Sequence, residues 1–368
     1  MRKKWLWMGL ALVLSACPQQ APQANTTPEE TSSYLQTVAQ DIQQVLQDLQ
    51  TALQGILPLR VQSLQELKAS LETLSRLPSL QSLGLEPLAT SDLPRGKLEC
   101  VGGICNQTGS SDDLEVRFKE QATDPWNLAL ADWNASRLGS PSSTVWVHTP
   151  SNTTDTQEMP TKAYFFLDLR EDGAKEGEAT LQAQWRPSTC LIGKYLFEPE
   201  NFSLSGHLNH PSTAGRLVDL RKLAFTSSST RLALEWDLST LTEGGRSAMT
   251  TKGTLGVNGT TTPGTCGSLL ENFDASTGDV NLELSTAHSS LRLAFKITQV
   301  EEEPFRIHLK DGYLQVDSKV VTFEGILDDQ NDNCVPGENL VLHFAGGQNM
   351  TLEEFLIQYM GAQPCNQP

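Results

Sequence analysis

The sequence predicts a mainly β protein with an N-terminal helical segment, an α+β arrangement in which helices cover one face of a large sheet. From Leu98 onward apolar and polar residues alternate with a period of two, which is typical of antiparallel strands with one dry and one wet face. Between Tyr34 and Leu77 apolar residues recur at helical spacing instead. Turn-forming residues separate the alternating segments, as in a meander. We therefore expect a large antiparallel meander sheet that forms an open half-barrel or a sandwich.

The first seventeen residues have the organisation of an export signal. Arg2, Lys3 and Lys4 precede the apolar run Trp5–Leu14. Its ten residues are too few for a bilayer span, which needs ~20, and fit the core of a signal peptide. The run ends in Leu14-Ser15-Ala16-Cys17. This motif resembles the lipobox of bacterial lipoproteins, which consists of leucine, two small residues and then cysteine.

The lipobox resemblance implies a signal peptide over residues 1–16, cleavage before Cys17 and lipidation of Cys17. The protein would then be anchored to a membrane by acyl chains, each buried CH₂ contributing ~0.8 kcal/mol. Pro18 stands where an inner-membrane retention signal of enteric lipoproteins would have Asp, which implies the outer membrane if the cell has one. The expected location is the bacterial cell envelope, on the periplasmic or extracellular side. A plain secretory leader with a chance cysteine, or an uncleaved anchor, is the alternative.

The chain is strongly acidic, with 27 Lys and Arg against 44 Asp and Glu and a formal net charge of −17. Removal of the leader leaves 24 basic and 44 acidic residues, a net charge of −20. Binding to nucleic-acid phosphates requires clustered Lys and Arg, so this balance argues against a nucleic-acid partner. Divalent cations and envelope proteins remain candidate partners of the acidic surface.

Three segments precede the β region. Residues 17–33 are rich in Pro, Gln, Thr and Glu and should form a disordered tether. Residues 34–77 predict an amphipathic helical hairpin, whose first helix ends near Pro58 and whose second ends at Pro78. The heptad spacing leaves a coiled-coil oligomer as the alternative to packing of the two helices on each other or on the sheet. Residues 78–96, which contain several prolines, read as a linker.

Residues 97–368 should form the antiparallel β domain. Asp311-Gly312 between two alternating segments predicts a tight hairpin turn. Near the C-terminus, Thr351 and Glu354 predict a capping box at the start of a short helix over residues 352–360.

The cysteine count agrees with export. Seven cysteines become six once Cys17 is lipidated, and an even number in an exported chain indicates up to three disulfides. Of the fifteen pairings, we expect Cys100–Cys105, Cys190–Cys266 and Cys334–Cys365. A metal site is the alternative, although the spacings lack the CxxC pattern and neighbouring histidines of zinc sites.

The sequence contains few signals of chemistry. Common hydrolase, metalloprotease and phosphate-binding motifs are absent, and we name no catalytic residue. His207 and His210 are favoured as part of a solvated turn over a metal pair. Asp329, Asn331 and Asn333 have the alternating oxygens of a calcium loop, but Cys334 and Leu340 occupy positions where an EF-hand needs Gly and Glu. An Asn- and Asp-rich turn is preferred there to a calcium site, and no other cofactor is expected.

Three functions compete. The first is a non-catalytic, lipid-anchored envelope lipoprotein that binds a lipid or another apolar ligand on its curved sheet. The second is a structural or adhesive surface module that acts through protein partners or divalent cations. The third, a secreted hydrolase, has no motif in its favour but is not ruled out by missing motifs, because catalytic residues often converge from distant segments.

Overall fold

A computed structural model of the 368-residue chain describes most of the predicted β domain and the first helix. The described residues are 22–54, 96–102, 104–111, 114–119, 122–123, 126–132, 143–148, 154–159, 162–171, 174–187, 197–210, 215–244, 246–261, 273–331 and 333–365. The predicted signal peptide, the second helix of the hairpin and nearly all of the linker lie outside them.

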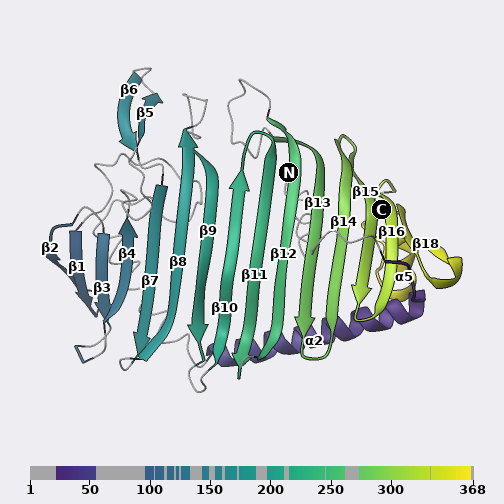
Figure 1. The fold of residues 1–368 in the computed structure, drawn as a ribbon, viewed down its shortest axis with the longest axis horizontal. Coiled ribbons are helices and arrows are strands. Elements are labelled where there is room, and N and C mark those ends of the chain that lie inside the picture. Colours follow the sequence, from purple (N-terminus) through teal and green to yellow (C-terminus); the bar gives the residue numbers. More distant parts are fainter. Residues whose placement is uncertain are drawn as a thin grey trace.

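One open sheet of 16 strands dominates the fold (Figure 1). Its order is β18-β17-β16-β15-β14-β13-β12-β11-β10-β9-β8-β7-β4-β3-β1-β2, and β5 and β6 form a separate two-stranded sheet. The strands are β1 (Gly96–Val101), β2 (Ile104–Gly109), β3 (Leu114–Lys119), β4 (Asn127–Asp132), β5 (Ser143–His148), β6 (Thr154–Met159), β7 (Lys162–Glu171), β8 (Ala174–Pro187), β9 (Phe197–Asn209), β10 (Arg216–Ser227), β11 (Arg231–Glu243), β12 (Arg246–Thr261), β13 (Phe273–Thr286), β14 (Ser290–Glu302), β15 (Phe305–Val316), β16 (Lys319–Leu327), β17 (Asn339–His343) and β18 (Asn349–Thr351).

The connectivity is the predicted meander except toward the N-terminal edge, where β4 pairs with β7 and β5 and β6 are left out of the sheet. From β7 to β18 every strand pairs antiparallel with the next one along the chain. At the other end β1 pairs parallel with β3, and β2 pairs antiparallel with β1. Hairpins between neighbouring antiparallel strands need only short turns, so alternation over many successive segments produces one wide sheet.

Helix α2 (Pro28–Gln54) begins six residues before the predicted start, so the predicted tether over residues 17–33 is wrong from Asn25 onward. Thr27 caps the helix: its Oγ1 accepts a hydrogen bond from Glu30 N at 3.3 Å, and a Glu30 carboxylate oxygen accepts one from Thr27 N at 3.2 Å. Pro28 occupies the first helical position, where its missing N–H costs no hydrogen bond. Polar composition suggested disorder, but these residues satisfy the orphan amides at the start of a helix.

The segment before α2 is attached to the C-terminal edge of the sheet. Asn25 N donates to Val320 O at 2.9 Å, and Val320 N donates to Asn25 Oδ1 at 2.6 Å. Ala345 N donates to Thr26 O at 2.9 Å, and Thr26 itself is buried. The chain is therefore fixed to β16 and to the loop after β17 before the helix begins.

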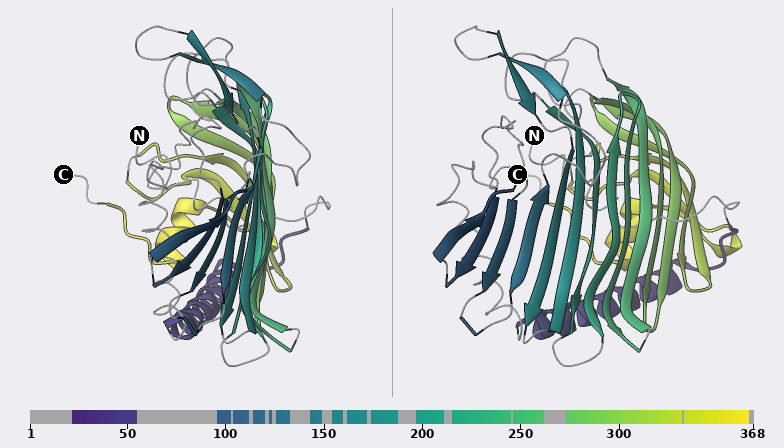
Figure 2. Two further views of the ribbon diagram at one scale, coloured as in Figure 1. Left: turned by 90° about the vertical axis from the view of Figure 1, so that its left-hand side faces the viewer. Right: turned by 60° about the vertical axis from the view of Figure 1, so that its left-hand side comes forward.

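Figure 2 shows α2 and the C-terminal helix α5 (Leu352–Tyr359) on the same side of the curved sheet. Helix α2 crosses the lower ends of the strands in Figure 1 and touches β10–β13, β15 and β16. Val38 and Val45 face the sheet, in the stripe that the heptad pattern predicts. Within the described part of the chain, no helix is long and apolar enough to span a bilayer.

The C-terminal elements match the sequence at one point and depart from it at another. Helix α5 has the predicted capping box between Thr351 and Glu354. The predicted hairpin turn at Asp311-Gly312 is wrong, because both residues lie inside β15. Asp311 has a φ of 54°, and the register with β16 shifts between Leu309 and Gly312, which marks a bulge. The chain turns instead at residues 303–304 and 317–318.

Candidate functional site

One face of the sheet is apolar across nearly its whole width. Directly opposed residues on neighbouring strands point to the same face, so the registers trace rows of side chains across the strands. A row that reaches from β1 to β15 is apolar except for one glycine and one threonine, and we call the face that carries it the dry face. Its members are Leu98, Val116, Ala129, Leu167, Ala179, Gly206, Leu220, Leu238, Thr251, Leu284, Leu291 and Val316.

Two more rows of the dry face cross the middle of the sheet. The first contains Phe165, Leu181, Leu204, Leu223, Trp236, Gly253, Leu282, Leu293, Leu314 and Val321. The second contains Phe202, Phe225, Leu234, Leu255, Val280 and Phe295. Each row continues from strand to strand, although some of the connections between these strands lie outside the described residues.

Both ends of the dry face are buried. Toward the C-terminus, Leu282, Leu284 and Leu291 are 1–7 % exposed and pack with Val38 and Val45 of α2. A neighbouring cluster buries Phe355 of α5 among residues of β13–β17. Toward the N-terminus, Leu98, Val116 and Phe118 form a third cluster, with exposures of 9 %, 1 % and 3 %.

The middle of the dry face is not buried to the same degree. Ten large apolar side chains of these rows on β8–β12 remain partly exposed. Leu220 and Leu238 share the row of the buried Leu284, and Trp236 packs against the cluster that contains Val38 and Val45 of α2. The other seven are Leu181, Phe202, Leu204, Leu223, Phe225, Leu234 and Leu255. We call these seven residues the central apolar surface. It is a candidate for a ligand-binding surface, because contiguous apolar area of this kind costs free energy in water unless something covers it.

The position of α2 explains where burial stops. Ser289 and Thr286 hydroxyls donate to Asp41 Oδ2 at 2.7 Å and 2.8 Å, which holds the helix at the turn between β13 and β14. On β11 and β12 the helix packs with residues near the strand ends, such as Leu241 and Met249. Leu234 and Leu255 of the central apolar surface lie farther along the same two strands, away from the ends on which α2 packs.

The opposite face, which we call the wet face, carries ion pairs between neighbouring strands. Lys222, Asp237, Lys252, Glu283 and Arg292 stand opposite one another on five successive strands and alternate in charge. Glu283 accepts from Lys252 Nζ at 2.6 Å and lies 3.3 Å from Arg292 Nε. Such exposed pairs contribute about 0–1 kcal/mol each, and their main effect is to keep this face soluble.

Among the described histidines that lie within 4.0 Å of a carboxylate oxygen, His207 has the least exposed side chain. Its side chain is 12 % exposed, and its Nδ1 lies 3.5 Å from Glu178. Burial lowers the pKa of His207, and the nearby charge of Arg216 lowers it further. A hydrogen bond from Lys175 lowers the pKa of Glu178. His207 is therefore neutral at pH 7, and it lies within β9 whereas His210 follows its end.

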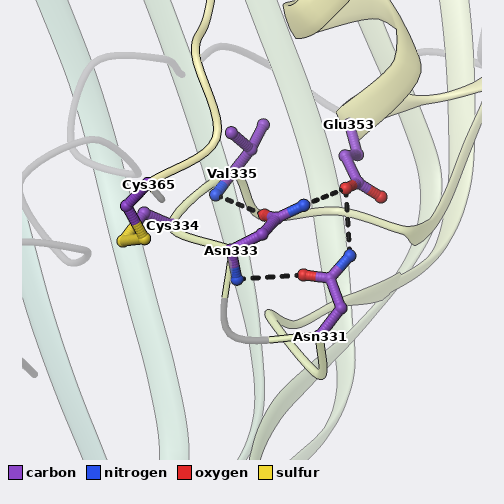
Figure 3. Close-up of a disulfide and its surroundings, with 6 residues drawn as sticks. All are labelled: Asn331, Asn333, Cys334, Val335, Glu353 and Cys365. Carbon is purple, nitrogen blue, oxygen red and sulfur yellow. Dashed lines mark hydrogen bonds between the residues drawn. A yellow bond between two sulfur atoms is a disulfide. The ribbon is translucent and has the colours of Figure 1, made fainter. Parts of the chain in front are cut away.

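Figure 3 shows the turn that the sequence marked as a possible calcium loop. Asn331 and Asn333 donate their amides to one oxygen of Glu353, and their own Oδ1 atoms accept from Asn333 N and Val335 N. The amide oxygens that a cation would need are thus taken by backbone amides. Asp329 Oδ1 is buried without a hydrogen bond among the described residues, which also contain no cluster of three His, Cys, Asp or Glu able to hold a metal.

A disulfide closes the same region. Cys334 and Cys365 are bonded, with a Cα–Cα distance of 5.6 Å, and Cys365 N donates to Asn333 O at 2.8 Å. Cys100 is disulfide-bonded, and Cys105 stands opposite it in the register of β1 and β2. Cys17, Cys190 and Cys266 lie outside the described residues, so lipidation and the Cys190–Cys266 pairing stay predictions.

Comparison with known proteins gives no relative for this chain: no family model, no curated protein and no solved structure matches it. The candidate surface therefore depends on the geometry of this chain. Alternation located the strands and their dry face, but no sequence signal separated the central apolar surface from the buried ends. Toward the C-terminus that difference depends on which strands α2 and α5 cover, and so on tertiary packing.

Proposed function

We propose that this protein is a lipid-anchored lipoprotein of the bacterial cell envelope that binds a lipid or another apolar ligand without catalysis. The observation that carries the proposal is the central apolar surface, which continues the buried rows of the dry face while its own side chains stay partly exposed. If the central apolar surface served only to stabilise the fold, we would expect it to be buried, as the dry face is on both sides of it.

The dimensions of the surface suit an elongated apolar molecule. Five neighbouring strands at ~4.8 Å spacing give it a width of roughly 20 Å. Two aromatic rings, Phe202 and Phe225, stand side by side in it, among aliphatic residues. Removal of apolar area from water contributes ~25 cal/mol per Å², so an aliphatic chain that covers these side chains would gain free energy without any specific polar contact.

The proposed anchor places the domain close to a source of such ligands. Asn25 is hydrogen-bonded to β16 and lies only eight positions after Cys17. At no more than ~3.6 Å per residue, Asn25 stays within about 29 Å of a lipidated Cys17. The proposed tether, residues 17–24, would thus be half as long as composition suggested, and the sheet would stand near the bilayer surface.

The anchor is tested by fractionation of cells that express the chain with Cys17→Ser. We expect wild type in the membrane fraction, with the mass of an acylated N-terminal cysteine after purification. The variant should carry no lipid mass and should be absent from the cleaved protein of the membrane fraction. Wild type without acyl mass would refute the anchor and leave the ligand question open.

The ligand surface is tested on the mature chain without its lipidated Cys17, from Pro18 to Pro368, which includes every described residue. Native mass spectrometry should show co-purifying lipid, and an environment-sensitive apolar dye should bind and compete with it. Leu234→Asn places an amide in the central apolar surface, whereas Ala233→Asn places the same amide on the adjacent residue of the wet face. We expect Leu234→Asn alone to lose dye and lipid, with both variants folded by circular dichroism. A lipid-free wild type that binds no dye would refute the proposal.

A further inference from the structure

The two edges of the 16-stranded sheet differ in a way that points to a second interaction surface. At one edge, β18 has only three residues, and α5 follows it directly and packs against β17. At the other edge, β2 is six residues long, and among the described residues no strand pairs with its outer side. A free edge of this kind presents unpaired backbone N–H and C=O groups to solvent.

Strand β2 lacks the charges and prolines that usually protect an edge, although a shift of its register with β1 between Lys97 and Leu98 places a bulge at Thr108, near its end. Its sequence, Ile104–Gly109, contains no charged residue and no proline, and its pairing with β1 is regular from Leu98 to Val101. Lysine, proline, bulges or extreme shortness are the common protections against pairing with another chain. Ile104, at the start of the strand, is 71 % exposed, the highest value among the large hydrophobic side chains described. An uncharged edge with an exposed β-branched residue favours strand addition.

We propose that β2 pairs antiparallel with β2 of a second copy of this chain, which joins two 16-stranded sheets into one. A two-fold axis perpendicular to the sheet produces this contact, and the same patch serves on both copies, so the assembly closes as a dimer. The dry face of one copy then continues into the dry face of the other. This surface is separate from the central apolar surface and does not depend on a bound ligand.

Charge and hydrogen bonding both favour a second copy as the occupant. The chain has a net charge of −17, which opposes most self-association. Strand β2 has no charge, and β1 and β3 together carry three basic and two acidic residues, so this edge is the exception. With the dry faces kept together, the two-fold axis falls on Asn106 or on Gln107. Either register places an amide side chain opposite its own copy, and an amide both donates and accepts.

The test uses the mature chain from Pro18 to Pro368 and sedimentation velocity over a range of concentrations. We expect the molar mass to rise from that of one chain toward twice that value, without larger species. The double variant Asn106→Lys/Gln107→Lys places like charges opposite each other in either register and should stay monomeric over the same range. The matched control, Gln348→Lys/Asn349→Lys, adds the same charge at the opposite edge and should dimerise as wild type does.

Hydrogen exchange keeps the test decisive. Backbone amides of β2 should become more protected as the concentration of wild type rises, while those of β18 should not change. All four residues of the two double variants are exposed, so circular dichroism and melting temperature should match wild type. A wild type that stays monomeric, a dimer that survives in the β2 variant, or a dimer lost in the β18 control would each overturn the proposal.

Discussion

The dry face behaves differently over β13–β17 and over β8–β12, although the same rows of apolar residues cross both regions. Leu282 and Leu234 lie on alternating strands of the same type and in adjacent rows, because Leu282 is two residues from Val280, which belongs to the row of Leu234. Leu282 is 1 % exposed beneath α2, whereas Leu234 remains partly exposed. Alternation thus decides which side of a strand is apolar, but burial requires a second layer, and α2 and α5 supply that layer mainly toward the C-terminal end.

The largest expected effect contrasts Leu282→Ala with Leu234→Ala. Truncation of Leu282 removes a fully buried side chain and leaves a cavity, so we expect a loss of about 2–5 kcal/mol in the free energy of unfolding. Leu234 keeps part of its contact with water in the folded protein, so its truncation should lower the free energy of unfolding by roughly 1 kcal/mol or less. Urea unfolding of the mature chain measures both. Equal costs would mean that the central apolar surface is part of the core.

The covering layer at the C-terminal end should depend on its disulfide. Cys334 and Cys365 enclose β17, β18 and α5, with a sequence separation of 31. Loss of a cross-link of this loop length costs about 2–4 kcal/mol in a chain-entropy account. We therefore expect the Cys334→Ser/Cys365→Ser variant to unfold at lower denaturant concentration, with increased hydrogen exchange in α5. Unchanged exchange in α5 would show that packing of Phe355 alone holds this layer in place.

Much of this architecture follows from local pattern, and the part that does not is informative. Period-two alternation located the strands, and the heptad stripe gave the face of α2 that packs on the sheet. The predicted start of α2 is six residues too late, because the capping signature Thr27-Pro28-Glu29-Glu30 lies in a segment whose polar composition is also typical of disorder. The dipeptide Asp311-Gly312 suits both a hairpin turn and a bulge, and in the structure it lies at a bulge. Only strand order decides between these two.

The candidate surface was beyond sequence reasoning for a different reason. Leu181, Leu223 and Leu234 are flanked along the chain by polar residues or alanine, and so are the buried Leu282 and Leu293. Their exposure depends on where α2 crosses the sheet, and that position is set by contacts between residues more than 200 positions apart, such as Asp41 with Ser289. No local period contains such information.

The smallest expected effect concerns this contact between α2 and the turn of β13 and β14. Hydrogen bonds from Ser289 and then Thr286 lower the pKa of Asp41. Their stabilisation is therefore present above the pKa of the unfolded aspartate, near ~3.9, and is lost as pH falls through the lower pKa of the folded state. We expect Asp41→Ala to cost about 1 kcal/mol at neutral pH, measured by urea unfolding.

The pH dependence separates this contact from a simple loss of helix stability. The difference in unfolding free energy between wild type and Asp41→Ala should shrink as pH falls below ~4, because protonation removes from wild type what the variant already lacks. Gln40→Ala, at the exposed neighbouring position of the same helix, is the control and should show no such trend. A difference that stays constant into the acid range would assign the cost of Asp41→Ala to the helix rather than to its bonds with Thr286 and Ser289. In that case the position of α2 over the turn between β13 and β14 would be set by apolar packing such as that of Val38 and Val45, and not by these two hydrogen bonds.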